Sequence, residues 1–471
     1  MSSILEKLKI YPAIAKGIYH YNFYGPPCKS WDLKTLITIY VARLLFGSYA
    51  NLNAHRKKLV RDTDTSVKNS TTELVTIPNK FREKAYNLVK NHLRSVYGND
   101  KWYDEESIWS NSSPLEPEWV IPAHLTKSST SKAILYFHGG GYLMGGFSTY
   151  RSCLETLAQG SDSIVLGAQY RLAPDYSAPC QLEDALAHVL YLTSPVEESG
   201  IGLSFDQIVV SGDSAGGGLT CVLNHFMRDA NIGKFAGSLV FSPWVDLKIN
   251  HPSCTDCAET DVLPTLTGSD YELAENGELA PGMFKDVYHA VDPKLQSKMV
   301  ERGHYLAPVE YLNSPIVSPL CDSNFRDLPP TLITSGEVEM LRDNSYLYQE
   351  LINKSYTEEE LSKFSIPPST MHHYSEMYHD FAFLNPDSST SDIAFKRAIN
   401  FIKQCHNQKS SEFEEVKTNS PINLLKSDKC DDSSIPLKWK NLYLSTVNDH
   451  ELVPFTPNYK RVEIQTWKGS N

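Results

Sequence analysis

The sequence predicts an α/β fold in which a mostly parallel central sheet is covered by helices on both faces. From residue 133 to residue 402, short apolar β-branched runs alternate with segments whose apolar residues recur at helical spacing. This alternation is typical of a doubly wound sheet with right-handed crossovers. The first strand-like run, 133–137, is apolar throughout, as expected for a strand buried on both faces of a parallel sheet. Glycine-rich corners follow two of these runs.

The predicted elements follow one another in regular order. The first strand, 133–137, is a short apolar run. The first helix, 181–192, places Leu182, Leu186, Val189 and Leu190 on one face. The other predicted strands lie at 164–168, 208–210, 238–241, 330–334 and 371–374. The other predicted helices lie at 219–227, from Arg342 onward, and at 393–402.

A change of pattern on either side of this region divides the chain into three parts. Residues 1–114 are helical and polar in pattern, so we expect an all-helical N-terminal cap. Residues 115–406 form the main domain, with an irregular insertion at 246–318 beside the top of the sheet. Residues 407–471 form a polar linker and a C-terminal extension, whose strand-like fragments have no assigned role.

The composition excludes several classes of protein. Of the 471 residues, 41% are hydrophobic, which supplies a buried core and excludes a disordered chain. The formal net charge of −12 argues against a nucleic-acid partner, because phosphate binding requires clustered Lys and Arg. Nine cysteines, an odd number without framework spacing, indicate a reducing compartment. We therefore expect a cytoplasmic protein, and the sequence leaves its oligomeric state open.

The most apolar early stretch, residues 36–47, bears on membrane contact. It is too short to span a bilayer and it carries Arg43, and the N-terminus lacks the layout of a signal peptide. Two interpretations stay open: a helix packed on its own protein, or an amphipathic helix resting on a membrane such as the endoplasmic reticulum. Packing is the commoner role of such helices and is favoured.

The chemistry is expected at the corner that contains Ser214. The strand-like run 208–210 ends in Gly212, Asp213, Ser214, Ala215 and Gly216, and a helical segment follows. A serine between two glycines at a strand-to-helix corner is a nucleophile elbow, in which a tight turn exposes the hydroxyl at the top of the sheet. The glycines are needed because a Cβ there would collide with neighbouring backbone. The motif is short, so its context is what gives it weight.

A second glycine-rich corner, His138–Gly141, follows the strand 133–137. Glycines leave backbone N–H groups unshielded, and with the N–H of Ala215 these groups could bind a developing oxyanion. A phosphate-binding loop is the alternative, but the Lys and Ser or Thr that it needs do not follow. His138 itself is expected to be a hydrogen-bonded structural residue.

An acid and then a histidine base should follow the serine in the chain, each in a loop after a late strand. His379 is the histidine that lies between a late strand and the closing helix, whereas the other downstream histidines lie in helices, strands or the insertion. For the acid, Glu337 and Glu339 share one loop, and spacing alone does not separate them. Asp343 is a third choice, already at a helix N-terminus. The competing histidines are His225, His251, His289, His304, His372 and His373.

Five motifs in order resemble the hormone-sensitive-lipase-like branch of the α/β-hydrolases, closest to fungal members such as the steryl acetyl hydrolases. The resemblance covers residues 119–406 and implies an α/β-hydrolase fold, a Ser-acid-His carboxylesterase and a helical cap over the pocket. The motifs are His138–Tyr142, Tyr170–Pro174, Gly212–Gly217, Ser242–Trp244 and Ser318–Leu320.

The resemblance also selects residues. Glu339–Asp343 matches the stretch Asp-Pro-Leu-Arg-Asp that holds the family's acid, which selects Glu339 over Glu337. By the same matching, Gly140, Gly141 and Ala215 form the oxyanion hole. Two departures stand out. Glu replaces the commoner Asp, and Asp380 replaces the Gly beside the base, where its carboxylate either perturbs His379 or faces water.

The expected function is hydrolysis of a small-molecule carboxylic ester, lipophilic or short in its acyl part. Ser214 is the expected nucleophile, His379 the base and Glu339 the acid, and the chemistry requires no metal or cofactor. Two alternatives remain: an amidase or deacetylase on the same triad, and a hydrolase-fold protein that binds a ligand without chemistry.

Overall fold

The computed structural model describes residues 2–46, 52, 56, 67–98, 102, 108–127, 132–248, 250–264, 279, 283–408, 440–447 and 450–457. Within them, ten strands form one sheet in the order β1-β2-β4-β3-β5-β6-β7-β8-β9-β10. The strands from β4 to β9 in this order are parallel, and β1, β2 and β10 are antiparallel to their neighbours. The predicted mostly parallel sheet is confirmed. The strands are β1 (Ser70–Leu74), β2 (Glu118–Pro122), β3 (Ala133–Phe137), β4 (Ile164–Ala168), β5 (Ile208–Asp213), β6 (Gly237–Phe241), β7 (Thr331–Gly336), β8 (Ser369–Tyr374), β9 (Leu442–Ser445) and β10 (Leu452–Pro454).

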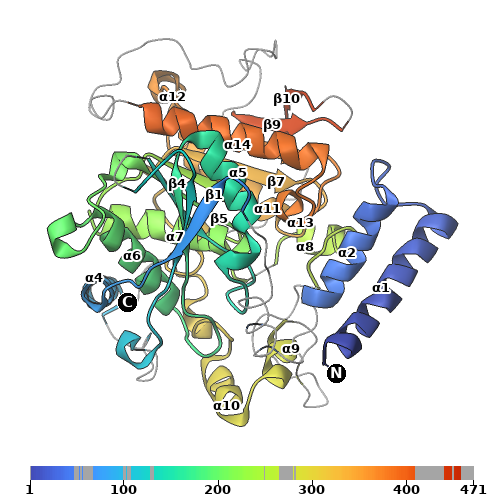
Figure 1. Cartoon of the computed structure of the whole chain (residues 1–471), viewed down its shortest axis with the longest axis horizontal. Helices are drawn as coiled ribbons and strands as arrows, with labels where there is room; N and C mark the ends of the chain where they lie inside the picture. The colour runs from blue at the N-terminus through green and yellow to red at the C-terminus, as the bar shows by residue number, and fades with distance from the viewer. Residues whose placement is uncertain are drawn as a thin grey trace.

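Helices cover both faces of the sheet (Figure 1). Side chains of α6, α7 and α11 pack on one face, and those of α5 and α14 pack on the other. The helices are α1 (Ser2–Tyr24), α2 (Leu33–Phe46), α4 (Asn79–Tyr97), α5 (Arg151–Ser161), α6 (Cys180–Thr193), α7 (Ser214–Asp229), α8 (Ser253–Asp256), α9 (Met283–Ala290), α10 (Pro293–Arg302), α11 (Arg342–Lys354), α12 (Glu358–Lys363), α13 (Phe381–Leu384) and α14 (Ser389–Asn407).

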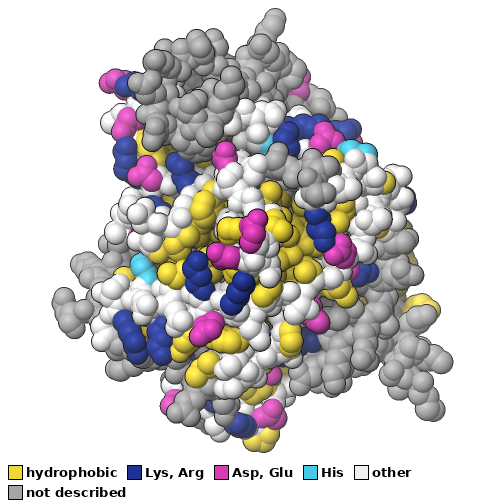
Figure 2. Space-filling view, turned by 60° about the vertical axis from the view of Figure 1, so that its left-hand side comes forward, with side chains coloured by type: hydrophobic (Ala, Val, Ile, Leu, Met, Phe, Trp, Pro, Cys, Tyr) yellow, Lys and Arg dark blue, Asp and Glu magenta, His cyan; other side chains and the backbone are white. Residues whose placement is uncertain are grey.

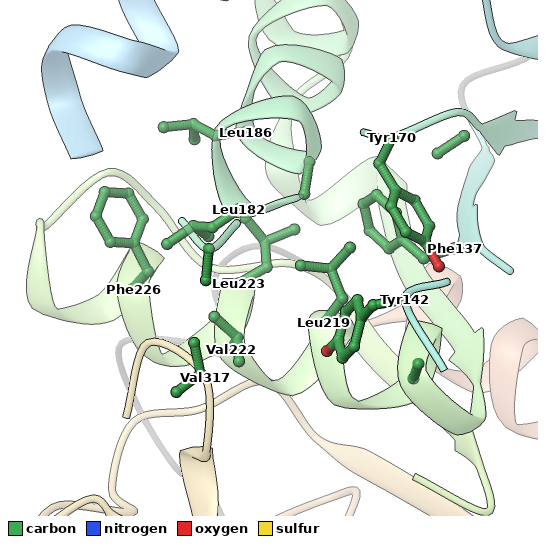
Figure 3. Packing of buried hydrophobic residues seen from close by; sticks show 14 of the residues in the cluster. Phe137, Tyr142, Tyr170, Leu182, Leu186, Leu219, Val222, Leu223, Phe226 and Val317 are labelled. Carbon is green, nitrogen blue, oxygen red and sulfur yellow. The ribbon is translucent and has the colours of Figure 1, made fainter. Parts of the chain in front are cut away.

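The core owes its two layers to the alternation of side chains along each strand. On β3, Leu135 belongs to the cluster under α6 and α7, whereas Ile134 and Tyr136 belong to the cluster under α5 and α14. In Figure 3, leucines of α6 lie against apolar side chains of α7, and burial of each such leucine stabilises the fold by roughly 1.5–3 kcal/mol. This packing fixes α7, whose first residue is Ser214.

The N-terminal region differs from the all-helical expectation, because β1 lies within it and pairs with β2. Four of the five residues of β1 are exposed, so this edge strand lacks the apolar run that signals a buried one. Helix α4 agrees with the helical pattern expected of this region, and it packs against α6. Helix α2 buries Leu36, Ile39 and Ala42, in agreement with the favoured packing on its own protein.

The structure describes part of the insertion at 246–318 and part of the C-terminal residues 407–471. The insertion contains three short helices, α8 to α10, among its described residues. The predicted linker lies outside the described residues, except for its first two. The strand-like fragments of the extension are β9 and β10, and β9 pairs in parallel with β8, so the extension continues the central sheet.

The face of the molecule in Figure 2 carries charges of both signs interspersed with apolar side chains. Among the helices that the structure describes, none combines the length and hydropathy needed to cross a bilayer.

Candidate active site

The corner between β5 and α7 has the geometry of a nucleophile elbow. Ser214 is the first residue of α7, and its φ of +50° is a left-handed conformation that side chains rarely adopt. A Cβ at Gly212 would lie 2.5 Å from the carbonyl of Gly216, and one at Gly216 would lie 2.1 Å from the carbonyl oxygen of Phe137. Both glycines are therefore required by close backbone contacts, as the motif predicts.

The structure brings His379 to this serine. The imidazole Nε2 lies 2.9 Å from the Oγ of Ser214, and both side chains are almost completely buried. His379 lies in the loop between β8 and α13, the position that sequence reasoning selected. The neighbouring His372 and His373 belong instead to the buried strand β8, where burial lowers the pKa of each to about 3.

Glu339 lies near this pair without a hydrogen bond to it. Its carboxylate accepts hydrogen bonds from Ser242 Oγ at 2.6 Å, the Gly336 N–H at 3.0 Å and Ser335 Oγ at 3.2 Å. Among the described residues, Nδ1 of His379 has no hydrogen-bond partner. Burial raises the pKa of Glu339 to about 7, against the opposing effect of the charge on His379.

The other two candidate acids are directed elsewhere. Glu337 accepts hydrogen bonds from the Oγ of Ser375 and the backbone N–H of Glu376. Asp343 is held by Arg342 and by the backbone N–H of Ser253. Neither carboxylate makes a hydrogen bond to His379 within the described part of the chain.

Asp380, the departure beside the base, contacts the imidazole. Its Oδ2 lies 3.1 Å from Nε2 of His379, and its side chain is only 11% exposed. Its φ of +52° explains why glycine suits this position. The sequence left open whether the Asp380 carboxylate perturbs His379 or faces water, and the structure shows that it contacts His379. Burial lowers the pKa of His379, but the carboxylates of Asp380, Glu339 and Asp261 outweigh burial and raise it to about 10.

Asp213, which precedes the serine, organises the glycine-rich corner. Its buried carboxylate accepts hydrogen bonds from Tyr136 at 2.7 Å, Tyr150 at 2.8 Å and the Gly139 N–H at 2.9 Å. Burial, followed by the charge of Asp380, raises the pKa of Asp213 well above its usual value. The N–H of Gly139 is thus occupied, and sequence reasoning did not assign this role to Asp213.

Gly140 and Gly141 are the other two glycines of this corner. No backbone hydrogen bond within the described chain uses the N–H of Gly140 or Gly141, and both residues have positive φ. His138 is structural, as expected. Its ring stacks on Tyr170 at 4.4 Å, and burial lowers its pKa to about 4.

The serine opens into a cavity of about 300 Å³. The last two residues of α2, Leu45 and Phe46, line it together with Gly140 and Gly141, so the N-terminal helix contributes to the pocket. Further apolar side chains complete the wall: Met144, Trp244, Leu263, Leu341, Phe383 and Leu384.

Comparison with known proteins places this chain in a family. A model described as "alpha/beta hydrolase fold", Abhydrolase_3, matches residues 134–383, more than half of the chain. Esterase LipI of Mycobacterium tuberculosis is 28% identical over 243 residues, covering 51% of this chain and 66% of LipI. An AB hydrolase superfamily protein of Schizosaccharomyces pombe is 25% identical over 356 residues, covering 70% of this chain and 96% of that protein.

Another relative and a solved structure extend the comparison. Human arylacetamide deacetylase-like 3 is 28% identical over 309 residues, covering 56% of this chain and 72% of that protein. The crystal structure of EstE5 soaked with p-nitrophenyl butyrate has a TM-score of 0.53 at 22% identity, covering 79% of this chain and 99% of EstE5, which supports the fold. The chain therefore belongs to the alpha/beta-hydrolase family Abhydrolase_3 and is a carboxylesterase- and lipase-like hydrolase.

Proposed function

We propose that this protein is a serine carboxylester hydrolase in which Ser214 is the nucleophile, His379 the general base and Glu339 the acid. The observation that carries this proposal is the 2.9 Å contact between His379 Nε2 and Ser214 Oγ at the elbow. A hydroxyl becomes nucleophilic when a base within hydrogen-bond reach takes its proton.

The proposed reaction proceeds through an acyl-enzyme. His379 accepts the proton of Ser214 as Oγ attacks the ester carbonyl, and it then protonates the departing alcohol. Water, activated by the same imidazole, attacks the acyl-enzyme and releases the acid. The N–H groups of Gly140, Gly141 and Ala215 bind the oxyanion in both steps, and loss of one such donor raises the barrier by about 3 kcal/mol.

Glu339 stabilises the imidazolium that forms in each step. A catalytic hydrogen bond is often long or misaligned without substrate and tightens in the complex, so a bond from Nδ1 of His379 to Glu339 is expected there. The buried position of Glu339 and its electrostatic attraction for the protonated imidazole of His379 support this role.

The cavity favours a lipophilic ester. Its apolar wall matches an apolar acyl chain or alcohol, and its volume of about 300 Å³ suits a substrate that is small on one side of the ester. The resemblance to fungal steryl acetyl hydrolases makes acetyl esters of bulky apolar alcohols the first substrates to test.

A panel of p-nitrophenyl esters from acetyl to longer chains tests the proposal. We expect the purified protein to hydrolyse the short esters, and Ser214→Ala to abolish the activity because the nucleophile is lost. Hydrolysis that survives this substitution would refute the assignment. A protein that binds the esters without turnover would be a ligand-binding member of the fold.

Deacetylation of amides is the second candidate function, because one relative is named arylacetamide deacetylase-like 3. The same triad can attack an amide carbonyl. An acetyl ester and the matching acetanilide distinguish the two activities: the ester should have the higher kcat/KM if ester hydrolysis is the main reaction.

A further inference from the structure

A carboxylate of the insertion joins the two loops that hold the proposed acid and base. Asp261, fully buried, accepts the backbone N–H of His379 through Oδ1 at 2.9 Å. Its Oδ2 accepts the backbone N–H of Met340, the residue after Glu339, at 2.6 Å. The N–H of Val262 adds a third hydrogen bond, to Oδ1, at 2.7 Å. One side chain therefore ties both loops together.

The segment that carries Asp261 is held firmly in place. Thr260 Oγ1 donates to the carbonyl oxygen of Val338 at 2.9 Å, so the segment is also fastened to the acid loop. Arg43 of α2 donates to the carbonyl oxygens of Asp261 and Ala258. Residues 258–261 of the insertion thus contact both α2 and the loops that hold Glu339 and His379.

The chemistry of these contacts requires a carboxylate. All three donors are N–H groups, and they approach both oxygens of Asp261, so each oxygen must accept. In an amide of the same shape, one oxygen becomes an NH₂ group that faces an N–H donor. That substitution leaves at least one buried donor unsatisfied and removes a negative charge close to the imidazole.

We propose that Asp261 is a positioning residue of the esterase, which fixes the His379 loop relative to the Glu339 loop and thereby aligns the imidazole with Ser214. This inference rests on the proposed function of Ser214 and His379. Through Asp261, the insertion at 246–318 would contribute to catalysis. The sequence alone indicated only that this region is irregular and lies beside the sheet.

The charge of Asp261 is one of three negative charges that act on the pKa of His379. His379 is faced by Asp380 of its own loop, by Glu339 of the β7 loop and by Asp261 of the insertion. All three carboxylates favour the imidazolium. Removal of the Asp261 charge therefore leaves the imidazole neutral down to lower pH.

Asp261→Asn in the full-length protein tests the inference, with Asp246→Asn as the matched control. Asp246 is a buried carboxylate of the same insertion, bonded to His251 and to the N–H of Lys248. We expect Asp261→Asn to lower kcat for p-nitrophenyl acetate by roughly 10- to 100-fold with little change in KM, because a small misalignment of the base slows chemistry. The acid limb of its kcat/KM profile should move to lower pH, whereas Asp246→Asn should leave that limb in place.

Several outcomes would overturn the inference. One is a Ser214-dependent wild-type activity that Asp261→Asn retains with unchanged kcat and pH profile. Another is loss of folded structure, measured by circular dichroism, in both Asp261→Asn and Asp261→Ser while Asp246→Asn stays folded, because the role is then structural. The proposed function fails separately, when the wild-type protein has no activity that depends on Ser214.

Discussion

At the scale of single residues, the carboxylate of Asp380 sets this site apart from one that has glycine beside the base. It lies 3.1 Å from Nε2 of His379, the nitrogen that accepts the proton of Ser214 in the proposed mechanism. A nearby negative charge stabilises the imidazolium, and a protonated imidazole cannot act as a base. Asp380 therefore raises the pH at which the enzyme becomes active.

We predict that Asp380→Asn moves the acid limb of the kcat/KM profile to lower pH by roughly one pH unit or more. The pKa of His379, raised to about 10 with Asp380 as its main partner, falls when that charge is removed, so the neutral base persists to lower pH. Rates measured from pH 5 to 10 check this shift. Asp387→Asn, a change at an exposed carboxylate in the same stretch, is the control and should leave the limb unchanged. An acid limb that stays in place or rises in Asp380→Asn contradicts the prediction.

Two substitutions separate the acid from its neighbour. Glu339→Gln should lower kcat by roughly 10³- to 10⁴-fold, because the imidazolium loses its stabilising charge. Glu337→Gln should change kcat little, since this carboxylate binds Ser375 and Glu376 instead. Steady-state rates with p-nitrophenyl acetate measure both effects. The opposite ranking would reject Glu339 as the acid.

The residues of the site differ in how far the sequence could predict them. Ser214 and His379 follow from their places at a strand-to-helix corner and after a late strand, and the structure puts them in contact. Asp261 lies in an irregular region and acts through backbone N–H groups, which leave no pattern of side chains to read. Asp213 was visible within the elbow motif, but its bond to Gly139 joins two corners far apart in the chain.

At the scale of elements, periodicity predicts what is buried on both sides and misses what lies at the edges. Every residue of the strands β3 to β8 is buried, and all six strands were predicted. The strand β1 was missed because its side chains are mostly exposed. The strand β2 is buried but lies in a stretch that proline residues make turn-like in sequence.

The contacts between elements explain the role of Arg171 in the motif Tyr170–Pro174. Its guanidinium binds Asp184 at 2.8 Å and Glu183 at 2.7 Å, both in the buried helix α6. The pairing ties the loop after β4 to α6. The sequence shows the motif and its place, but only the fold shows that two buried carboxylates require this cation.

At the scale of the whole molecule, the C-terminal extension completes the central sheet. Strand β9 covers the edge of β8, a strand whose six residues are all buried. An uncovered edge of this kind would present unpaired backbone groups to solvent and to other chains. A segment that follows a long polar stretch is therefore part of the same folded unit as the active site.

We predict that Leu442→Ala lowers the free energy of unfolding by roughly 2–5 kcal/mol, because Leu442 is fully buried in a cluster with Leu347 and Met371. Leu444→Ala, in the same strand but only half-buried, is the matched control and should cost less. Urea titration followed by circular dichroism measures both, and esterase activity per folded molecule should stay at the wild-type level because β9 does not reach the cavity lining. A Leu442→Ala variant as stable as the wild-type protein would show that the packing of β9 contributes little to the fold.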